Sequence, residues 1–131
     1  MNDLVSVIIP TYNRSYFVTE AIESVLCQTY PNIELIVVDD YSMDDTEEKL
    51  KPYKNKGKIK YIRNEKNKGI SPTVNTGLLA ANGKYIARLD DDDLFMPDKI
   101  EKQVKHFEED PDVGMVTSGC LIIPILVRND T

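Results

Sequence analysis

The sequence predicts an α/β fold of three layers, in which helices cover both faces of a mostly parallel, Rossmann-like sheet. Three observations support this prediction. Short β-branched runs alternate along the chain with longer segments that have helical periodicity. The connections between them are short, so successive parallel strands must be joined by right-handed crossovers. Acidic and polar residues directly follow several of the runs, at the strand ends where such sheets bind ligands.

The first half of the chain predicts two strands and two helices. Residues 5–9 (VSVII) are an apolar run that ends at Pro10, and residues 33–38 (IELIVV) are a second run of the same kind. Between these strands, residues 15–28 carry apolar side chains at helical spacing. A capping-box-like Ser-Met-Asp-Asp sequence then predicts a helix over about residues 42–53.

The second half continues the same alternation. Residues 71–81 predict a helix with a proline in its first turn, where proline is tolerated, and Pro97 begins another helix. The alternating residues 58–63 (KIKYIR) predict a strand near an edge of the sheet. The remaining predicted strands are 84–89, 113–117 and, as a sixth candidate, 121–127.

Length and composition fit one globular domain. The chain has 131 residues, enough for one packed core, so we expect residues 1–131 to form a single domain. No apolar run reaches the roughly 20 residues that cross a bilayer, and the N-terminal run lacks the features of a signal peptide. Two distant cysteines, Cys27 and Cys120, suit a reducing cytosol, and we expect both to pack in the core.

The net charge of −6 conceals a strong asymmetry. Nine of the 16 basic residues lie between Lys49 and Lys68, opposed only by Glu65, while the rest of the chain is acidic. The overall acidity argues against nucleic acid as the main partner, because phosphate binding needs a basic surface. The basic stretch suits an anionic lipid surface or a phosphate, and its simpler interpretation is a solvated helix end and loop.

Three of the predicted strand ends carry residues suited to ligand binding: residues 10–14 (PTYNR), residues 39–40 (two aspartates) and residues 90–93 (four aspartates). Adjacent carboxylates repel one another, and a divalent cation relieves that repulsion. Mg²⁺ or Mn²⁺ typically takes one or two carboxylates together with phosphate oxygens and water. The pattern at residues 90–93 therefore favours a metal site over the simpler alternative of a solvated turn.

Spacing suggests how these acids divide their tasks. In extended backbone, Asp90 and Asp92 point to the same side, which would let one face a ribose while the other holds a metal. At residues 39–40, one carboxylate suits backbone N–H groups of neighbouring loops, and the other suits a nucleobase or ribose. The chain contains neither G-x-G-x-x-G nor G-x-x-x-x-G-K-[ST], which argues against a dinucleotide oxidoreductase and a P-loop NTPase.

The chain contains a series of motifs whose order is itself informative. They are residues 5–14 (VSVIIPTYNR), 24–30 (SVLCQTY), 34–40 (ELIVVDD), 67–70 (NKGI), 75–78 (NTGL), 81–93 (ANGKYIARLDDDD) and 97–104 (PDKIEKQV). In this order they closely resemble the inverting family 2 glycosyltransferases, which have the GT-A fold. Because the resemblance covers nearly the whole chain, it is far more specific than a single D-x-D motif.

The resemblance implies a GT-A domain that binds a nucleoside-diphosphate sugar, with a UDP-sugar favoured. The implied reaction transfers the sugar to a glycan or lipid-linked acceptor with inversion, assisted by Mn²⁺ or Mg²⁺. Bacterial surface-polysaccharide assembly is the usual setting, so we expect a cytoplasmic protein that associates peripherally with the inner face of the membrane. We also expect the acceptor-side part of the domain to be absent from this chain.

The resemblance also assigns the base-binding side of the site. Pro10, Thr11 and Tyr12 would line the base and the ribose. Asp40 would accept a hydrogen bond from the base, and Asn67 would lie near the base as well.

On the phosphate side, the resemblance places Asp90 and Asp91 at the ribose and the diphosphate, with Asp92 as the metal ligand. Arg88 has two interpretations, since it would either reach the site or pair with an acid across the sheet. Many relatives carry arginine where this chain has Val74, so that arginine's contact with a phosphate or the base would be absent here or supplied by Lys68.

No catalytic base is assigned. In the family this base is an acid beyond the D-x-D region, and the acids at residues 108–112 have the pattern of a solvated helix end. His106 is the only histidine, and we expect it at or near the surface.

Two other functions remain as alternatives. The first is a non-catalytic nucleotide-binding fragment. The second is a phosphoacceptor receiver domain, which is disfavoured because it would carry its acid pair after the first strand and a lysine after the fifth.

Overall fold

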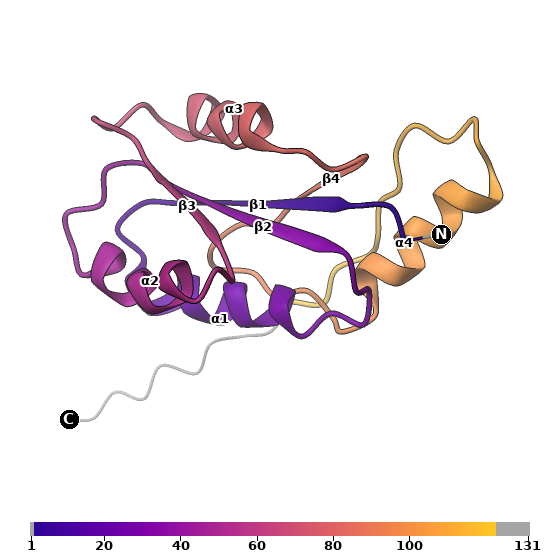
Figure 1. The fold of residues 1–131 in the computed structure, drawn as a ribbon, viewed down its shortest axis with the longest axis horizontal. Coiled ribbons are helices and arrows are strands. Elements are labelled where there is room, and N and C mark those ends of the chain that lie inside the picture. The colour runs from indigo at the N-terminus through magenta and orange to yellow at the C-terminus, as the bar shows by residue number, and fades with distance from the viewer. Residues whose placement is uncertain (1, 123–131) are drawn as a thin grey trace.

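The computed structural model describes residues 2–122 (Figure 1). The described part has four parallel strands and four helices, and the strand order in the sheet is β3-β2-β1-β4. In chain order the elements are β1 (Val5–Thr11), α1 (Ser15–Leu26), β2 (Ile33–Asp39), α2 (Thr46–Asn55), β3 (Lys60–Arg63), α3 (Ile70–Ala80), β4 (Tyr85–Arg88) and α4 (Lys99–Glu109). Figure 1 shows α3 on one face of the sheet and α1 and α2 on the other. The predicted three-layer α/β architecture is confirmed, and β3 lies at an edge as expected.

The register of the two central strands determines where the site forms. β1 and β2 pair along their whole length, from Val5 opposite Ile33 to Thr11 opposite Asp39. Both strands therefore leave the sheet at the same edge, and the N–H of Asp40 donates to the Thr11 carbonyl at 2.9 Å. On the other side of β1, the Leu89 N–H donates to the Ile8 carbonyl at 3.0 Å, so the aspartates after Leu89 reach this edge too.

The core lies between the sheet and the helices on the α1 side. All seven residues of β1 are buried, as parallel strands covered on both faces require. The buried face of α1 consists of Val18, Ala21, Ile22 and Val25, at the spacing of a single helix face. Each buried aliphatic side chain of this kind contributes roughly 1.5–3 kcal/mol through removal from water.

On the opposite face, α3 approaches β1 closely enough to require glycine at position 77. A Cβ atom on Gly77 would lie 2.5 Å from Cγ2 of Ile8, which is fully buried. We expect Gly77→Ala to lower the free energy of unfolding by about 1–3 kcal/mol, because overpacking outweighs the better helix propensity of alanine. Urea denaturation measures this. The matched control on the same helix is Leu79→Ala, which is 90% exposed and should change stability by less than about 0.5 kcal/mol. A Gly77→Ala protein as stable as the wild type would contradict the close approach.

Helix α2 begins four residues later than predicted. The segment before it is a loop held by its own polar groups: the Ser42 N–H donates to Asp39 at 2.8 Å, and Asp44 accepts from the N–H of Ser15 at 3.1 Å. The Ser42 hydroxyl, which would cap a helix starting there, instead accepts from the N–H of Asn13 at 2.9 Å. The first helical residue is therefore Thr46.

The predicted strand at residues 113–117 is wrong. In the structure this segment runs as a loop, because no neighbouring strand in the described residues offers it a ladder of hydrogen bonds. Its carbonyl at Val116 instead accepts from the Gln103 side chain at 3.3 Å. Of the candidate strand 121–127, residues 121–122 are not in a strand, and the rest lies outside the described residues.

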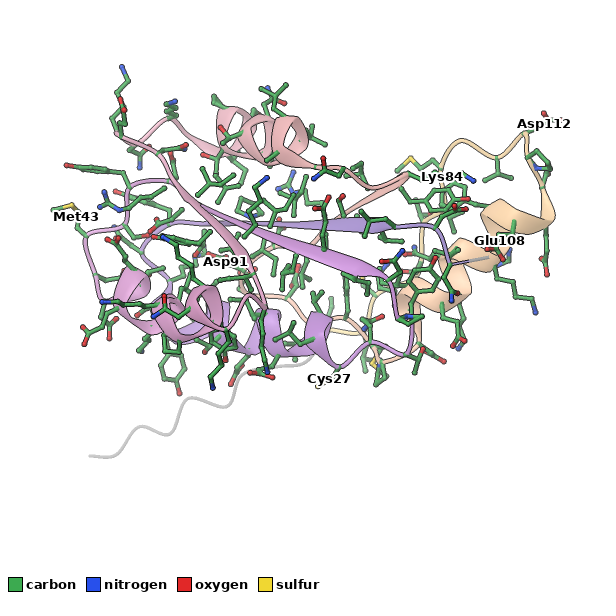
Figure 2. All side chains as sticks on the ribbon, in the orientation of Figure 1. Cys27, Met43, Lys84, Asp91, Glu108 and Asp112 are labelled. Atoms are coloured by element: carbon green, nitrogen blue, oxygen red, sulfur yellow. The ribbon has the colours of Figure 1, made fainter. Side chains whose placement is uncertain are left out.

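The prediction that both cysteines pack in the core is also wrong. Cys27 follows the last turn of α1 and lies at the surface (Figure 2). Cys120 is exposed as well. The sequence predicts a helix that continues to residue 28, whereas α1 ends at Leu26. Cys27 is therefore the C-cap residue and does not belong to the buried face of the helix. His106 is exposed as expected. Among residues 2–122, no helix combines the length and the apolar character that a membrane span needs.

Candidate functional site

A pocket of about 480 Å³ opens at the carboxyl edge of the sheet. Its walls come from the loops that follow β1, β2, β3 and β4, as expected for a parallel α/β sheet. All eight residues assigned to the site from the sequence line it. The complete lining is Pro10, Thr11, Tyr12, Arg14, Asp40, Asn67, Gly69, Ile70, Thr73, Arg88, Asp90, Asp91 and Asp92.

The end of β1 forms the first wall of the pocket. Thr11 is buried and its hydroxyl donates to Asp91 at 2.8 Å, which joins this wall to the aspartate loop. The ring of Tyr12 is 45% exposed and is available to an incoming flat group. Asn13 then adopts a left-handed conformation with φ of 50°, and this turns the chain away from the sheet into α1.

Asp40 organises the opposite wall from the end of β2. Its carboxylate accepts hydrogen bonds from the Asn64 side chain at 2.8 Å and from the N–H groups of Lys68 and Gly69 at 2.8 and 2.9 Å. Burial alone would raise the pKa of Asp40, but these bonds, with a further one from Thr73, hold the pKa below its usual value. The carboxylate thus shapes the loop that carries Asn67 along the pocket.

Asp39 has a structural role only. It is fully buried and accepts from the Ser42 N–H at 2.8 Å and from the Tyr61 hydroxyl at 2.5 Å. Burial, followed by the bond to Asp39, raises the pKa of Tyr61. The division of tasks predicted for residues 39–40 is therefore only partly seen, because both carboxylates hold neighbouring loops and Asp40 alone lines the pocket.

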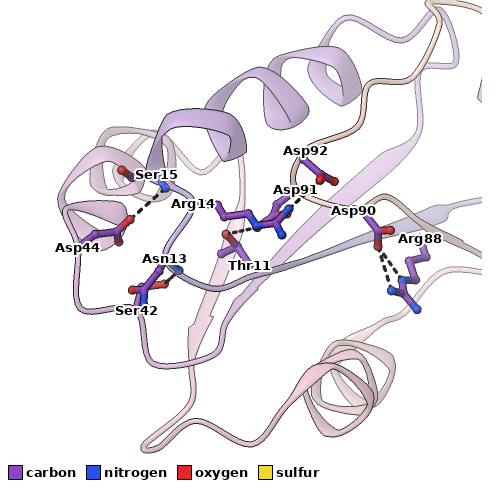
Figure 3. Close-up of polar contacts among 10 residues, drawn as sticks. All are labelled: Thr11, Asn13, Arg14, Ser15, Ser42, Asp44, Arg88, Asp90, Asp91 and Asp92. Atoms are coloured by element: carbon purple, nitrogen blue, oxygen red, sulfur yellow. Dashed lines mark hydrogen bonds and ion pairs between the residues drawn. The ribbon is translucent and has the colours of Figure 1, made fainter. Parts of the chain in front are cut away.

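The aspartate cluster forms the third wall, where every lining carboxylate has a polar partner (Figure 3). Asp90 pairs with Arg88 at 2.9 Å, and Asp92 pairs with Arg14 at 2.7 Å. Asp91 is buried and accepts from Thr11. The segment is a turn, closed by a 3.1 Å bond from the Asp93 N–H to the Asp90 carbonyl, so the extended backbone assumed for Asp90 and Asp92 is wrong.

Two arginines, Arg88 and Arg14, line the pocket, and the sequence had assigned neither of them firmly to the site. Arg88 lines the pocket and also pairs with an acid, although its partner Asp90 lies two residues further on and not across the sheet. Arg14 was not assigned to the site from the sequence. Its place at the end of the Pro-Thr-Tyr-Asn-Arg motif was the available signal.

The pocket is electrostatically unsuited to an anion by itself. Four carboxylates and two guanidinium groups line it, which gives a formal charge of −2. No group of three or more potential metal ligands is gathered in the part of the chain that the structure describes. Asp92, whose side chain is 46% exposed, fits the role of a single carboxylate ligand, with phosphate oxygens and water completing the shell of a Mg²⁺ or Mn²⁺ ion.

Ionisation of the Asp91 carboxyl is expected to lower the free energy of unfolding. Burial raises its pKa above the ordinary value of 3.8, although the Thr11 hydroxyl and the Arg14 charge oppose the shift. A carboxyl with a raised pKa in the folded state favours folding while protonated, and that contribution is lost as pH rises above 3.8. We expect Asp91→Asn to raise the free energy of unfolding at pH 7, with a smaller gain at pH 3.5.

Urea denaturation at the two pH values measures this effect. Asp112→Asn, an exposed change of the same kind, is the control and should leave stability nearly unchanged. A loss of stability at pH 7 in Asp91→Asn would show that the contacts of this carboxylate outweigh the cost of burying it.

The basic stretch does not form one surface at the pocket. Lys60 begins β3, so it lies toward the amino edge of the parallel sheet, away from the site. Lys68 lies at the site edge, where its N–H donates to Asp40. The acids near the end of α4 are also remote, since Glu108 and Asp112 lie at the far end of the molecule from Asp91 (Figure 2).

Comparison with known proteins agrees with this geometry. The family model described as Glycosyl transferase family 2 matches residues 6–120. The chain is 51% identical over 105 residues to an uncharacterized glycosyltransferase from Rickettsia felis, a match that covers 80% of this chain and 17% of that protein. It is 44% identical over 101 residues to UDP-Glc:alpha-D-GlcNAc-diphosphoundecaprenol beta-1,3-glucosyltransferase WfgD from Escherichia coli, covering 77% of this chain and 40% of WfgD.

Solved structures of glycosyltransferases are also similar to this chain. S. aureus TarS 1-349 in complex with UDP-GlcNAc matches with a TM-score of 0.75 and 32% identity, over 80% of this chain and 31% of that one. The mannosyltransferase PcManGT from Pyrobaculum calidifontis, in complex with GDP-Man and Mn²⁺, matches with a TM-score of 0.77 and 29% identity, over 84% of this chain and 33% of that one. The chain spans less than half the length of each of these proteins. The expected GT-A fold is confirmed, and the chain belongs to glycosyl transferase family 2.

Proposed function

We propose that this chain binds the donor, a nucleoside-diphosphate sugar and preferably a UDP-sugar, in a glycosyltransferase that transfers the sugar with inversion. One observation carries the proposal. The loops after four parallel strands bring Pro10, Thr11, Tyr12, Asp40, Asn67, Asp90, Asp91 and Asp92 to a single pocket. TarS with UDP or UDP-GlcNAc, and PcManGT with GDP-Man, are nucleotide complexes of similar folds, which supports this choice of donor.

The base and the ribose would occupy the side of the pocket formed by β1 and β2. Tyr12 offers an exposed ring there, and Asn67 lies on the loop that Asp40 holds in place. Asp40 retains acceptor capacity, since a carboxylate offers about four lone-pair sites and Oδ2 accepts from the Gly69 N–H at 2.9 Å. That oxygen would receive the N–H of the base.

The diphosphate would occupy the aspartate side with a divalent cation. A pocket of formal charge −2 repels a diphosphate, so a cation has to accompany it. Asp92 would hold the cation, while Asp90 and Asp91 would contact the ribose and the diphosphate. When bound, Mn²⁺ or Mg²⁺ supplies Lewis-acid stabilisation of the nucleoside-diphosphate leaving group. Deprotonation of the acceptor hydroxyl needs a general base, and we assign that role to no residue of this chain.

A glycan or a lipid-linked saccharide is the acceptor that we propose. The name of WfgD specifies a diphosphoundecaprenol-linked acceptor, and WfgD is 44% identical to this chain over the shared region. Such an acceptor is anchored in a membrane. We therefore propose that the enzyme acts in the cytoplasm at the inner membrane face.

Nucleotide-dependent thermal stabilisation tests the donor assignment. UDP with Mn²⁺ should raise the melting temperature of the chain by several degrees, because a ligand at 100 times its Kd stabilises the folded state by about 2.7 kcal/mol. UDP without metal should give a much smaller shift, and GDP, TDP and CMP with Mn²⁺ should give smaller shifts than UDP. No shift with any nucleotide, in the presence or absence of metal, would refute the donor site.

A further inference from the structure

Arg14 occupies the place in the pocket where a bound cation would be expected. Its Nη1 atom lies 2.7 Å from Oδ2 of Asp92 and 3.5 Å from Oδ1 of Asp91 (Figure 3). One guanidinium group therefore contacts both carboxylates. Its shorter contact is with Oδ2 of Asp92, the carboxylate that we propose as the metal ligand, so the guanidinium and a divalent cation would compete for the same charge.

The backbone on both sides of Arg14 is held firmly, while the side chain is not. Asn13 donates its N–H to Ser42 at 2.9 Å and accepts from the Met43 N–H at 2.8 Å, and the N–H of Ser15 donates to Asp44. These bonds anchor the residue at the start of α1 (Figure 3). The Arg14 side chain is 49% exposed, and it contacts the carboxylates of Asp91 and Asp92.

The exposure of the pair makes it exchangeable. Asp92 is 46% exposed, and ion pairs of such exposure contribute only about 0–1 kcal/mol. A guanidinium group released from Asp92 stays within the pocket, where its planar donors match phosphate oxygens better than any other side chain does. Retaining both contacts is unfavourable once a divalent cation is bound, because the two cations would repel each other across Asp92.

We propose that Arg14 is the resident counter-ion of Asp92 and exchanges partners during donor binding. In this exchange the divalent cation takes the Asp92 carboxylate, and the Arg14 guanidinium moves to the diphosphate. Arg14 is thus a donor-binding residue that also sets the affinity for metal. The inference rests on the proposed donor site. It adds that the affinity for the metal is low in the free protein and higher when a diphosphate is present to bind the Arg14 guanidinium.

The test measures two affinities whose changes have opposite signs. In Arg14→Gln, Mn²⁺ alone should bind at least about threefold more tightly than in the wild type, because its competitor is gone. At saturating Mn²⁺, UDP should bind about tenfold more weakly, because charge-assisted bonds to the diphosphate are lost. Electron paramagnetic resonance of free Mn²⁺ gives the first affinity, and titration calorimetry with UDP gives the second.

Two further variants control for charge and for folding. Lys102→Gln removes the same charge from an exposed pair with Asp98 at 2.7 Å and should change neither affinity. Arg14→Lys keeps the charge without the planar fork, so Mn²⁺ affinity should stay near the wild-type value while UDP affinity falls. This second variant provides the test if Arg14→Gln does not fold.

The outcomes separate this inference from the proposed function. If wild-type protein does not bind UDP with Mn²⁺, the donor site itself is refuted. If wild-type protein binds UDP with Mn²⁺ but Arg14→Gln binds Mn²⁺ no better than wild type, or binds UDP equally well, only the exchange of Arg14 is overturned. Weakening of both affinities also overturns it, since that result assigns Arg14 a purely structural role.

Discussion

Replacing Asp40 with alanine is expected to lower the free energy of unfolding by about 3 kcal/mol. The carboxylate accepts from the buried Asn64 side chain and from the N–H groups of Lys68 and Gly69. Alanine would remove the charged acceptor that these three donors share, and a hydrogen bond to a charged group contributes about 1.5–3 kcal/mol, with less expected where the donor is exposed. Urea denaturation followed by circular dichroism measures the loss.

The pH dependence gives this prediction a second signature. Because the pKa of Asp40 is lowered below 3.8, its contribution is fully present above that pH and is lost as pH falls through the lower folded value. The difference between wild type and Asp40→Ala should therefore shrink under strongly acidic conditions. Asp90→Ala removes an exposed carboxylate and should cost less than about 1 kcal/mol. Equal losses in the two variants would contradict the role assigned to Asp40.

Asp92→Asn should weaken UDP binding in the presence of Mn²⁺ by at least about tenfold. The amide keeps the shape of the side chain and one oxygen, but it loses the negative charge that a divalent cation needs. Without metal the sign reverses: the variant should bind UDP no more weakly than the wild type, because one charge that repels the diphosphate is gone. Calorimetric titrations with and without Mn²⁺ separate the two effects.

Asp93→Asn is the matched control for this prediction. The two residues are adjacent and exposed, and the substitution is chemically identical, but Asp93 is not among the residues described as lining the pocket. Its UDP affinity at saturating Mn²⁺ should stay within about threefold of the wild type. If both variants lose the metal-dependent affinity equally, the cluster acts through its total charge and Asp92 is not the metal ligand.

The location of the site could be predicted because it follows from topology. Parallel strands place their carboxyl ends at one edge, so the polar residues after each strand converge there regardless of how the loops between them are shaped. Residues 10–12, 39–40 and 90–92 meet for this reason. The match to family 2 over residues 6–120 also argues against the receiver-domain alternative.

Other features depend on contacts that no local pattern contains. Whether residues 113–117 form a strand depends on a neighbour to pair with. The Ser42 hydroxyl is likewise held by the N–H of Asn13, 29 residues away in the sequence. The pairing of Arg14 with Asp92, 78 residues away, belongs to the same class. Partners across the sheet, and not propensity, decide these details.

The most direct test of the donor site follows the backbone amides of ¹⁵N-labelled protein by nuclear magnetic resonance while UDP is added with Mg²⁺. We predict saturable shifts concentrated at residues 10–14, 67–70 and 90–93, the three segments that surround the pocket, with little change in α2 or α4. Omitting Mg²⁺ should weaken the binding at the same amides. The absence of saturable shifts, or shifts concentrated away from these segments, would contradict the assignment of this pocket as the nucleotide-sugar site.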